Sequence, residues 1–216
     1  MNQKKPQQRD TGRAVWIVGA VIAVVIGVAA IVAISQTGGG DDSEASGLQQ
    51  YSEITVEGES LPAFGEGDTD AAVGMTAPIV TGQGFTGNTV TTEPIGPTML
   101  VFLAHWCPHC QREVPLLVEW EASGTMPEGL DVIGVATATS PTNPNVPPSE
   151  WLTREYFPPL WPVLADDANN TAGNAFGVSG YPFFVLMDET GKVVQRISGE
   201  VSIDELNQII ETTLGL

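Results

Sequence analysis

Basic residues are scarce in this chain. Its 216 residues contain eight Lys and Arg against 26 Asp and Glu, which gives a formal net charge of −18 at pH 7. Four of the eight basic residues precede Ala14, so the remainder of the chain is even more acidic. Because such a surface repels phosphate groups, nucleic acid is not expected as a partner. The acidity favours solubility, and attraction to basic proteins is the alternative.

The sequence also lacks internal repeats, and its composition is neither collagen-like nor wholly disordered. Its length leaves room for one domain of ordinary size with additional segments. One hydrophobic core is therefore expected.

Charged residues are missing from residues 14–34, which are mostly Val, Ile, Ala and Gly. At about 1.5 Å per residue, a helix of this length crosses a hydrocarbon core of about 30 Å. Since the basic residues precede it, the positive-inside rule places residues 1–13 in the cytoplasm as a basic tail. We therefore predict a single-pass membrane anchor with the catalytic domain outside the cytoplasm. A cleaved signal peptide is the alternative, because Ala33 and Ser35 are suitably spaced small residues, although cleavable apolar regions usually span about 7–15 residues.

Residues 35–70 are rich in Gly, Ser and acidic residues and have few large apolar side chains. This composition is typical of a flexible, solvated linker. We interpret residues 51–56 as an apolar patch within a disordered stretch, with a short strand as the alternative. The folded domain is then expected to span residues 71–216.

Cysteine and histidine are scarce as well. The two cysteines and two histidines all lie within His105-Trp106-Cys107-Pro108-His109-Cys110. Two cysteines separated by two residues at the start of a helix can reach each other, so they can form and break a short disulfide. This spacing predicts thiol–disulfide chemistry. A purely structural disulfide is disfavoured, since so short a loop gives little stabilisation.

Metal binding is an alternative of another class. Two Cys and two His match the number of ligands in a zinc site or a soft-metal carrier. The spacing argues against it, because adjacent His109 and Cys110 diverge on a helix and Pro108 constrains the loop. No metal and no cofactor is therefore expected.

A βαβ unit surrounds the cysteines. Residues 99–103 form a compact apolar run, which is typical of a buried central strand. The following segment has Val114 and Leu117 at helical spacing, and residues 132–136 form a second apolar strand. A crossover of this kind predicts two parallel strands with a right-handed connection.

The end of the chain has the pattern of a hairpin and a helix. Residues 183–187 and 193–197 are apolar strands joined by a loop that contains Gly191. Ser202 and Glu205 form a capping box before a final amphipathic helix. Between the two halves we predict, in chain order, a helix at 150–156, a strand at 161–165 and a helix at 171–176.

Several marks follow one another along the chain: Trp106 before Cys107, Pro115 five residues after Cys110, Pro182 after Gly180-Tyr181, and Gly199 beyond the last strand. Together they resemble the thioredoxin superfamily over residues 74–216. The resemblance implies a thioredoxin-like α/β fold, with a central mixed sheet flanked by helices, and a cis-proline at Pro182.

Within the superfamily, the frame is most similar to membrane-tethered TlpA-like proteins, whose Gly-x-x-Ala-Pro opening appears here from Gly74 to Pro78. The dipeptide Pro108-His109 between the cysteines instead resembles that of DsbA oxidases. The chain therefore resembles a TlpA-type body that carries a DsbA-type CPHC motif.

The two cysteines are expected to have unequal roles. Cys107 at a helix N-terminus would be the nucleophile, because backbone N–H groups, the helix dipole and His109 all stabilise a thiolate there. Cys110, one turn further along, would be the resolving thiol. Stabilising the reduced form makes a disulfide more oxidising, so His109 favours the oxidation of substrates.

The resemblance also implies how substrates bind. Pro182 would present the backbone around Tyr181 to an extended substrate segment beside Cys107. Trp106 is expected to flank the site, with core packing as the alternative.

Two positions have no settled role. His105 is interpreted as an exposed rim residue, with electrostatic help to Cys107 as the alternative. Thioredoxin and DsbA have a buried acid where this chain has Val101, so a proton carrier would have to be water or another residue, with Glu113 as a candidate.

We therefore predict a membrane-tethered, extracytoplasmic thiol–disulfide oxidoreductase. It would exchange disulfides with exported proteins, with oxidation of substrates as the favoured direction. A TlpA-like reductase, for example in cytochrome c maturation, is the alternative. A membrane redox partner would recycle the dithiol.

Overall fold

The computed structural model describes residues 48–65 and 69–216. The predicted basic tail, transmembrane anchor and first part of the linker lie outside these residues. None of the helices within the described residues has the length and apolar character needed to cross a membrane.

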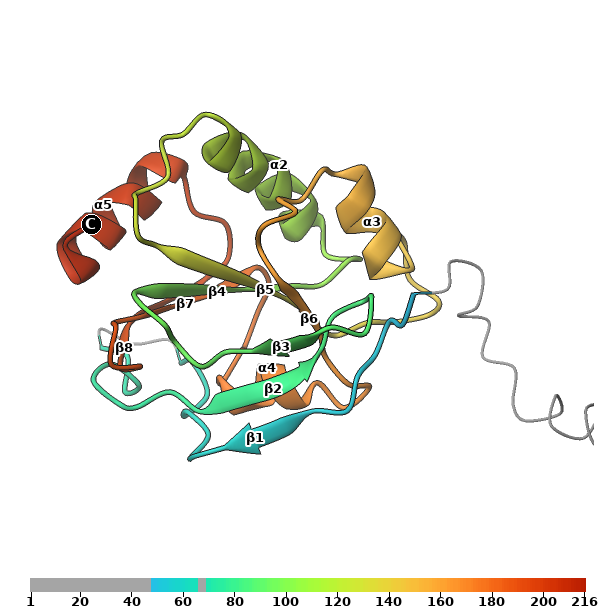
Figure 1. Ribbon diagram of the computed structural model, residues 1–216, viewed down its shortest axis with the longest axis horizontal. Helices are drawn as coiled ribbons and strands as arrows, with labels where there is room; N and C mark the ends of the chain where they lie inside the picture. The colour runs from blue at the N-terminus through green and yellow to red at the C-terminus, as the bar shows by residue number, and fades with distance from the viewer. Residues whose placement is uncertain (1–47, 66–68) are drawn as a thin grey trace, which may run out of the picture. The chain divides into compact units, whose positions relative to one another are not determined.

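A five-stranded mixed sheet forms the centre of the fold, in the order β6-β5-β4-β7-β8 (Figure 1). Its strands are β4 (Thr98–Leu103), β5 (Asp131–Ala136), β6 (Val163–Ala165), β7 (Phe183–Met187) and β8 (Val193–Ser198). The helices are α2 (Pro108–Ala122), α3 (Pro148–Arg154), α4 (Thr171–Ala175) and α5 (Ile203–Leu214). Strands β4, β5 and β6 are parallel, and β7 is antiparallel to both β4 and β8. The predicted βαβ unit and terminal hairpin are confirmed.

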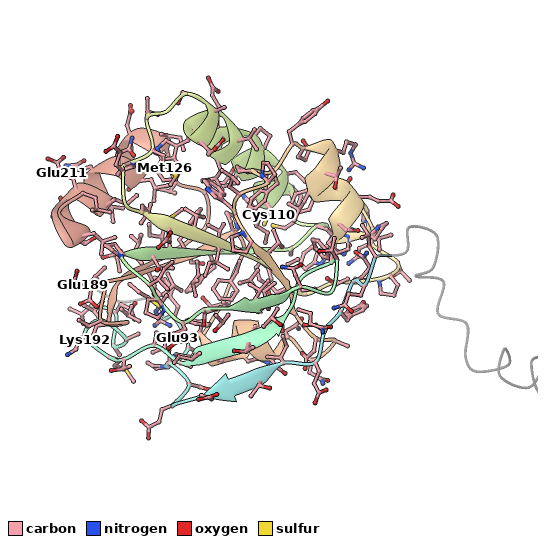
Figure 2. All side chains as sticks on the ribbon, in the orientation of Figure 1. Glu93, Cys110, Met126, Glu189, Lys192 and Glu211 are labelled. Carbon is pink, nitrogen blue, oxygen red and sulfur yellow. The ribbon has the colours of Figure 1, made fainter. Side chains whose placement is uncertain are left out.

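Strand β4 is buried on both faces, which explains its continuous apolar sequence. Met99 and Val101 face the core beneath α2 and α5, together with Cys110 (Figure 2). Leu100 and Phe102 face the opposite core, which contains α4. Side chains alternate between the faces of a strand, so every second residue of β4 serves the other core.

A second sheet contains β1 (Thr55–Glu57), β2 (Ile79–Gln83) and β3 (Thr89–Thr91), all antiparallel. The sequence pattern identified neither β2 nor β3. Strand β1 corrects the interpretation of residues 51–56 as an apolar patch in a disordered stretch. Its backbone pairs with β2, a partner that the local sequence does not reveal.

Residues 48–65 are attached to the rest of the domain by hydrogen bonds. The Ser52 hydroxyl donates to the carbonyl of Ala165 in β6 at 2.7 Å and accepts from the N–H of Gln83 at 3.0 Å. The N–H of Leu61, a buried residue, donates to the carbonyl of Ala175 at 2.8 Å. These contacts lie upstream of residue 71, where the sequence pattern places the domain boundary.

An ion pair between buried Arg196 and partly buried Asp70 holds the end of the same segment. Arg196 of β8 is fully buried, and its Nε and Nη2 lie 2.8 and 2.5 Å from the two carboxylate oxygens of Asp70. Its Nη1 donates to the carbonyls of Pro62 and Phe176, both at 2.9 Å. The hydrogen bond from Arg196 lowers the pKa of Asp70. Such a bidentate pair, with Nη1 also bound to two carbonyls, links the N-terminal segment to the sheet.

Replacing Arg196 with Met tests this link. Removing one partner leaves the Asp70 carboxylate uncompensated, so the free energy of unfolding should fall by about 3–5 kcal/mol in urea denaturation. The control is Arg154→Met, because the Arg154–Glu155 pair is exposed and 3.8 Å long. It should change the free energy by less than about 1 kcal/mol. Equal stability of Arg196→Met and the wild type would contradict the role of this pair.

Candidate active site

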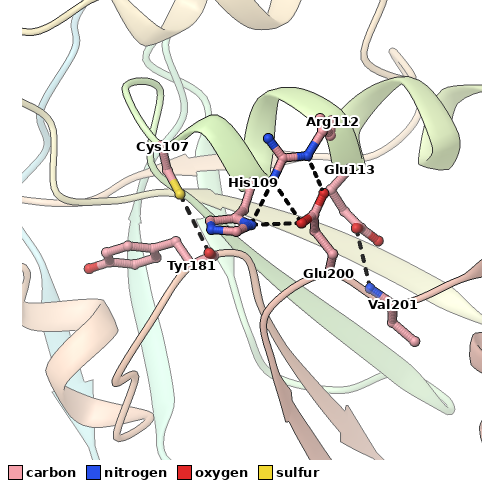
Figure 3. Close-up of polar contacts among 7 residues, drawn as sticks. All are labelled: Cys107, His109, Arg112, Glu113, Tyr181, Glu200 and Val201. Carbon is pink, nitrogen blue, oxygen red and sulfur yellow. Dashed lines mark hydrogen bonds and ion pairs between the residues drawn. The ribbon is translucent and has the colours of Figure 1, made fainter.

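Cys107 is the N-cap residue of α2 and lies just beyond the carboxyl end of β4. Its N–H donates to the carbonyl of Ala104 at 2.9 Å, and its carbonyl accepts from the N–H of Gln111 at 3.1 Å. Only 6% of the residue is exposed, and its Sγ lies 3.4 Å from the carbonyl oxygen of Tyr181 (Figure 3). The positive end of the helix dipole lies at this position. This is the placement expected of the predicted nucleophile.

Cys110 lies one turn further along α2 and is fully buried. The two cysteines are free thiols in this structure. Burial raises the pKa of Cys110, and the charge of Cys107 raises it further. Because Cys110 reacts only as a thiolate, a base must remove its proton.

The aromatic residues lie beside Cys107 as expected. The Tyr181–Pro182 peptide bond is cis. The Tyr181 ring meets the Trp106 ring edge-on, with centroids 6.2 Å apart, and Trp106 Nε1 donates to the carbonyl of Ala138 at 2.8 Å. Trp106 and Tyr181 therefore form one wall next to Cys107.

His105 is a buried residue, so its interpretation as an exposed rim residue is wrong. It is 1% exposed; its Nδ1 lies 2.7 Å from the carbonyl of Pro144, and its Nε2 accepts from the N–H of Ser140 at 3.0 Å. One nitrogen donates while the other accepts, which describes a neutral ring. Burial lowers the pKa of His105 and so also favours the neutral form. His105 thus anchors the loop that follows β5.

The same contacts bear on metal binding. Both nitrogens of His105 are occupied by backbone groups, so this side chain has no free ligand atom. Within residues 48–65 and 69–216, no group of three His, Cys, Asp or Glu side chains is placed to hold a metal ion.

His109 belongs to a charged cluster on the surface with Arg112 and Glu200. Its Nδ1 lies 2.6 Å from Glu200 Oε2, while Arg112 Nε and Nη2 donate to the Glu200 carboxylate at 2.7 and 2.9 Å (Figure 3). Arg112 Nη2 also lies 2.8 Å from His109 Nδ1. Two donors cannot satisfy each other, so we assign the Nδ1 proton to the bond with Glu200. The hydrogen bonds from Arg112 and His109 lower the pKa of Glu200 to about 2.

Glu113 places a carboxyl group in the core, one turn after Cys110 on α2. Its Oε2 accepts from the N–H of Val201 at 3.3 Å, and its Oε1 has no hydrogen-bond partner. Burial raises the pKa of Glu113 to about 7. Residues three apart share one side of a helix, and the charge of Glu113 contributes to the raised pKa of Cys110. Glu113 therefore places a buried carboxyl with a raised pKa within electrostatic range of Cys110.

Arg112, Glu200 and Val201 contact the site without having been predicted from the sequence. Arg112 was detectable in principle, because it lies three residues after His109 on the predicted helix. Glu200 and Val201 follow the last strand, and nothing in their local sequence indicates contact with α2.

Comparison with known families matches residues 72–210 to Redoxin. The chain belongs to the Redoxin family.

Two curated proteins with sequences similar to this chain are both named for thiol–disulfide chemistry. The thiol:disulfide interchange protein HelX of Rhodobacter capsulatus is 27% identical over 113 residues, which cover 52% of this chain and 58% of HelX. The thiol-disulfide oxidoreductase ResA of Geobacillus thermodenitrificans is 27% identical over 146 residues, or 67% of this chain and 79% of ResA. The predicted enzyme class, a thiol–disulfide oxidoreductase, is confirmed.

Solved structures confirm the fold of this Redoxin protein. A structure from Chlorobium tepidum, assigned as the thiol:disulfide interchange protein DsbE, has a TM-score of 0.54 and 26% identity over 66% of this chain and 98% of its own. DsbF of Mycobacterium tuberculosis has a TM-score of 0.51 and 25% identity over 67% and 98%. The thioredoxin-like α/β fold and the similarity to TlpA-type proteins are confirmed. The DsbA-like character of the CPHC motif stays a prediction.

Replacing Glu113 with Gln should change how stability depends on pH. The native state holds the Glu113 proton up to pH of about 7, whereas the unfolded chain loses it near 4.5. The unfolded state therefore binds fewer protons between these values, and this group makes stability fall as pH rises. At pH 8, Glu113→Gln should be more stable than the wild type by at most about 3 kcal/mol, and the difference should vanish below pH of about 4.

Denaturation in urea at several pH values measures this difference. Glu119→Gln, an exposed position on the same helix, is the control and should show no such divergence. A constant difference between Glu113→Gln and the wild type across this range would contradict the raised pKa of Glu113.

Proposed function

We propose that this Redoxin protein is a membrane-tethered, extracytoplasmic oxidoreductase that reduces disulfides of exported proteins. The tether is supported by the uncharged residues 14–34 and the basic residues before them. The direction is supported by the similarity to ResA and to a DsbE-type structure, which fit a TlpA-like reductase better than DsbA. The buried Glu113 carboxyl near the Cys110 thiol supports the exchange chemistry itself, because it offers a proton acceptor.

Reduction begins at Cys107. Its thiolate attacks one sulfur of the substrate disulfide, forms a mixed disulfide and releases the first substrate thiolate, which takes a proton from water. The wall of Trp106 and Tyr181 would receive the substrate segment next to Cys107 Sγ.

Resolution requires Cys110. The Cys110 thiol gives its proton to the Glu113 carboxylate, and the Cys110 sulfur then attacks Cys107 Sγ and releases the second substrate sulfur as a thiolate, which takes a proton from water. The substrate gains two electrons, and the enzyme keeps a Cys107–Cys110 disulfide. With a pKa of about 7, Glu113 is ionised in a large fraction of molecules at neutral pH. A membrane dithiol donor of two electrons would then restore the reduced enzyme.

Oxidation of substrates is the second candidate. It uses the same steps in reverse, with a membrane acceptor of two electrons. His109 beside Cys107 favours it, because a cation near the thiolate stabilises the reduced enzyme.

Replacing Glu113 with Gln should slow resolution by about tenfold or more, because Cys110 loses its base. Acid quenching and mass spectrometry of the reaction with a disulfide-containing peptide would show the mixed disulfide at Cys107. In the wild type the resolution rate should rise with pH through about 7 as Glu113 ionises, and in Glu113→Gln this step should be missing.

Two controls accompany this experiment. Cys110→Ser should trap the mixed disulfide completely, and Glu119→Gln should resolve it at the wild-type rate. Resolution by Glu113→Gln at the wild-type rate and with the same pH profile would exclude Glu113 as the base.

Equilibration of the full chain with glutathione buffers should distinguish the two directions. For a reductase, the potential should lie closer to about −270 mV, the thioredoxin value, than to the DsbA value of about −120 mV. Mass spectrometry of alkylated samples measures the fraction of dithiol. A potential near the DsbA value would support oxidation instead.

A further inference from the structure

The loop after β8 contacts both halves of the redox site. The Glu200 side chain binds His109 and Arg112 on the exposed side of α2. The next residue, Val201, donates its N–H to Glu113 on the buried side (Figure 3). Residues 200 and 201 therefore contact the charged groups near Cys107 and the carboxyl group near Cys110.

The Glu200 carboxylate lies between the two groups that can carry positive charge near Cys107. It takes two hydrogen bonds from Arg112, at 2.7 and 2.9 Å, and lies 2.6 Å from His109 Nδ1. The hydrogen bond to Glu200 is the main cause of a raised pKa of Arg112, and the charge of Cys107 adds to it, so Arg112 and Cys107 lie within electrostatic range. In this arrangement the negative charge of Glu200 offsets the positive charge that Cys107 would otherwise meet.

Charge near Cys107 acts on only one side of the redox equilibrium. The reactive form of the reduced enzyme is the Cys107 thiolate, whereas the disulfide carries no charge. A nearby cation therefore stabilises the reduced enzyme, and a nearby anion favours the disulfide.

We propose that Glu200 is a positioning residue that shifts the Cys107–Cys110 couple toward the disulfide, and so toward substrate reduction, by offsetting the charges of His109 and Arg112. This inference rests on the proposed exchange reaction, and it gives Glu200 a part in setting the equilibrium between the disulfide and the dithiol. The same contact explains how a reductase can have a Pro-His dipeptide between its cysteines. The His109 imidazole, which would otherwise stabilise the thiolate, is bound to the Glu200 carboxylate.

The test is the equilibrium with glutathione, in which the protein disulfide and two glutathione thiols give the protein dithiol and one glutathione disulfide. Glu200→Gln removes the charge but keeps the size of the side chain and an acceptor oxygen. Its equilibrium constant should move about two- to fivefold toward the dithiol, since the cluster is partly exposed. Glu189→Gln removes the same charge from the β7–β8 hairpin, away from Cys110 (Figure 2), and should match the wild type.

Two further measurements separate a charge effect from a structural one. The double variant Glu200→Gln/Arg112→Gln removes both signs of charge, so its constant should return toward the wild-type value. The effect of Glu200→Gln should also shrink in about 1 M salt, where exposed charges are screened within about 3 Å. An effect caused by a displaced loop would survive both treatments.

The outcomes are distinguishable. A wild-type chain that does not exchange with glutathione would overturn the proposed function and this inference with it. Exchange with equal constants for the wild type and Glu200→Gln, or a shift toward the disulfide, would overturn the role of Glu200 alone. A shift toward the dithiol that salt leaves unchanged would also overturn it.

Discussion

Strand β4 is buried on both faces, and the positions of the two cysteines depend on it. The chain leaves the sheet after Leu103 and begins α2 at Cys107, so the N-terminus of the helix lies at the carboxyl edge of the sheet. One face of α2 must then cover the core above β4, which takes Cys110 into the interior with Val114 and Leu117. The difference between Cys107, which is 6% exposed at the helix N-terminus, and the fully buried Cys110 is therefore a consequence of packing.

Two ionisable side chains share this interior and are accommodated differently. His105 has a partner for each ring nitrogen, is neutral, and connects a loop to the end of β4. Glu113 has one partner for its two oxygens, and burial raises its pKa to about 7. A satisfied polar group can be purely structural, but a half-satisfied carboxyl destabilises the native state whenever it ionises. Its presence next to Cys110 is understandable if the reaction needs a proton acceptor there.

The few basic residues of the domain have specialised places. Arg196 is buried and holds Asp70, which attaches the segment before the domain to β8. Arg112 lies at the edge of the redox site and is paired with Glu200. In a chain this acidic, an unpaired cation beside Cys107 would have a strong effect on the thiolate, and the Glu200 carboxylate moderates it.

The central strand, the terminal hairpin, the final helix and the cysteine pair could all be predicted from the sequence. Each corresponds to a local pattern: a long apolar run, a Gly-containing loop, a capping box and a CxxC spacing. Strand β1 could not be predicted from the sequence, because a strand this short depends on pairing with a distant part of the chain. The burial of His105 and the contacts of Glu200 and Val201 also depend on tertiary structure alone. Burial and hydrogen bonding involve residues that are far apart in the chain. These contacts determine which side chains are charged and which of the two cysteines each side chain lies near.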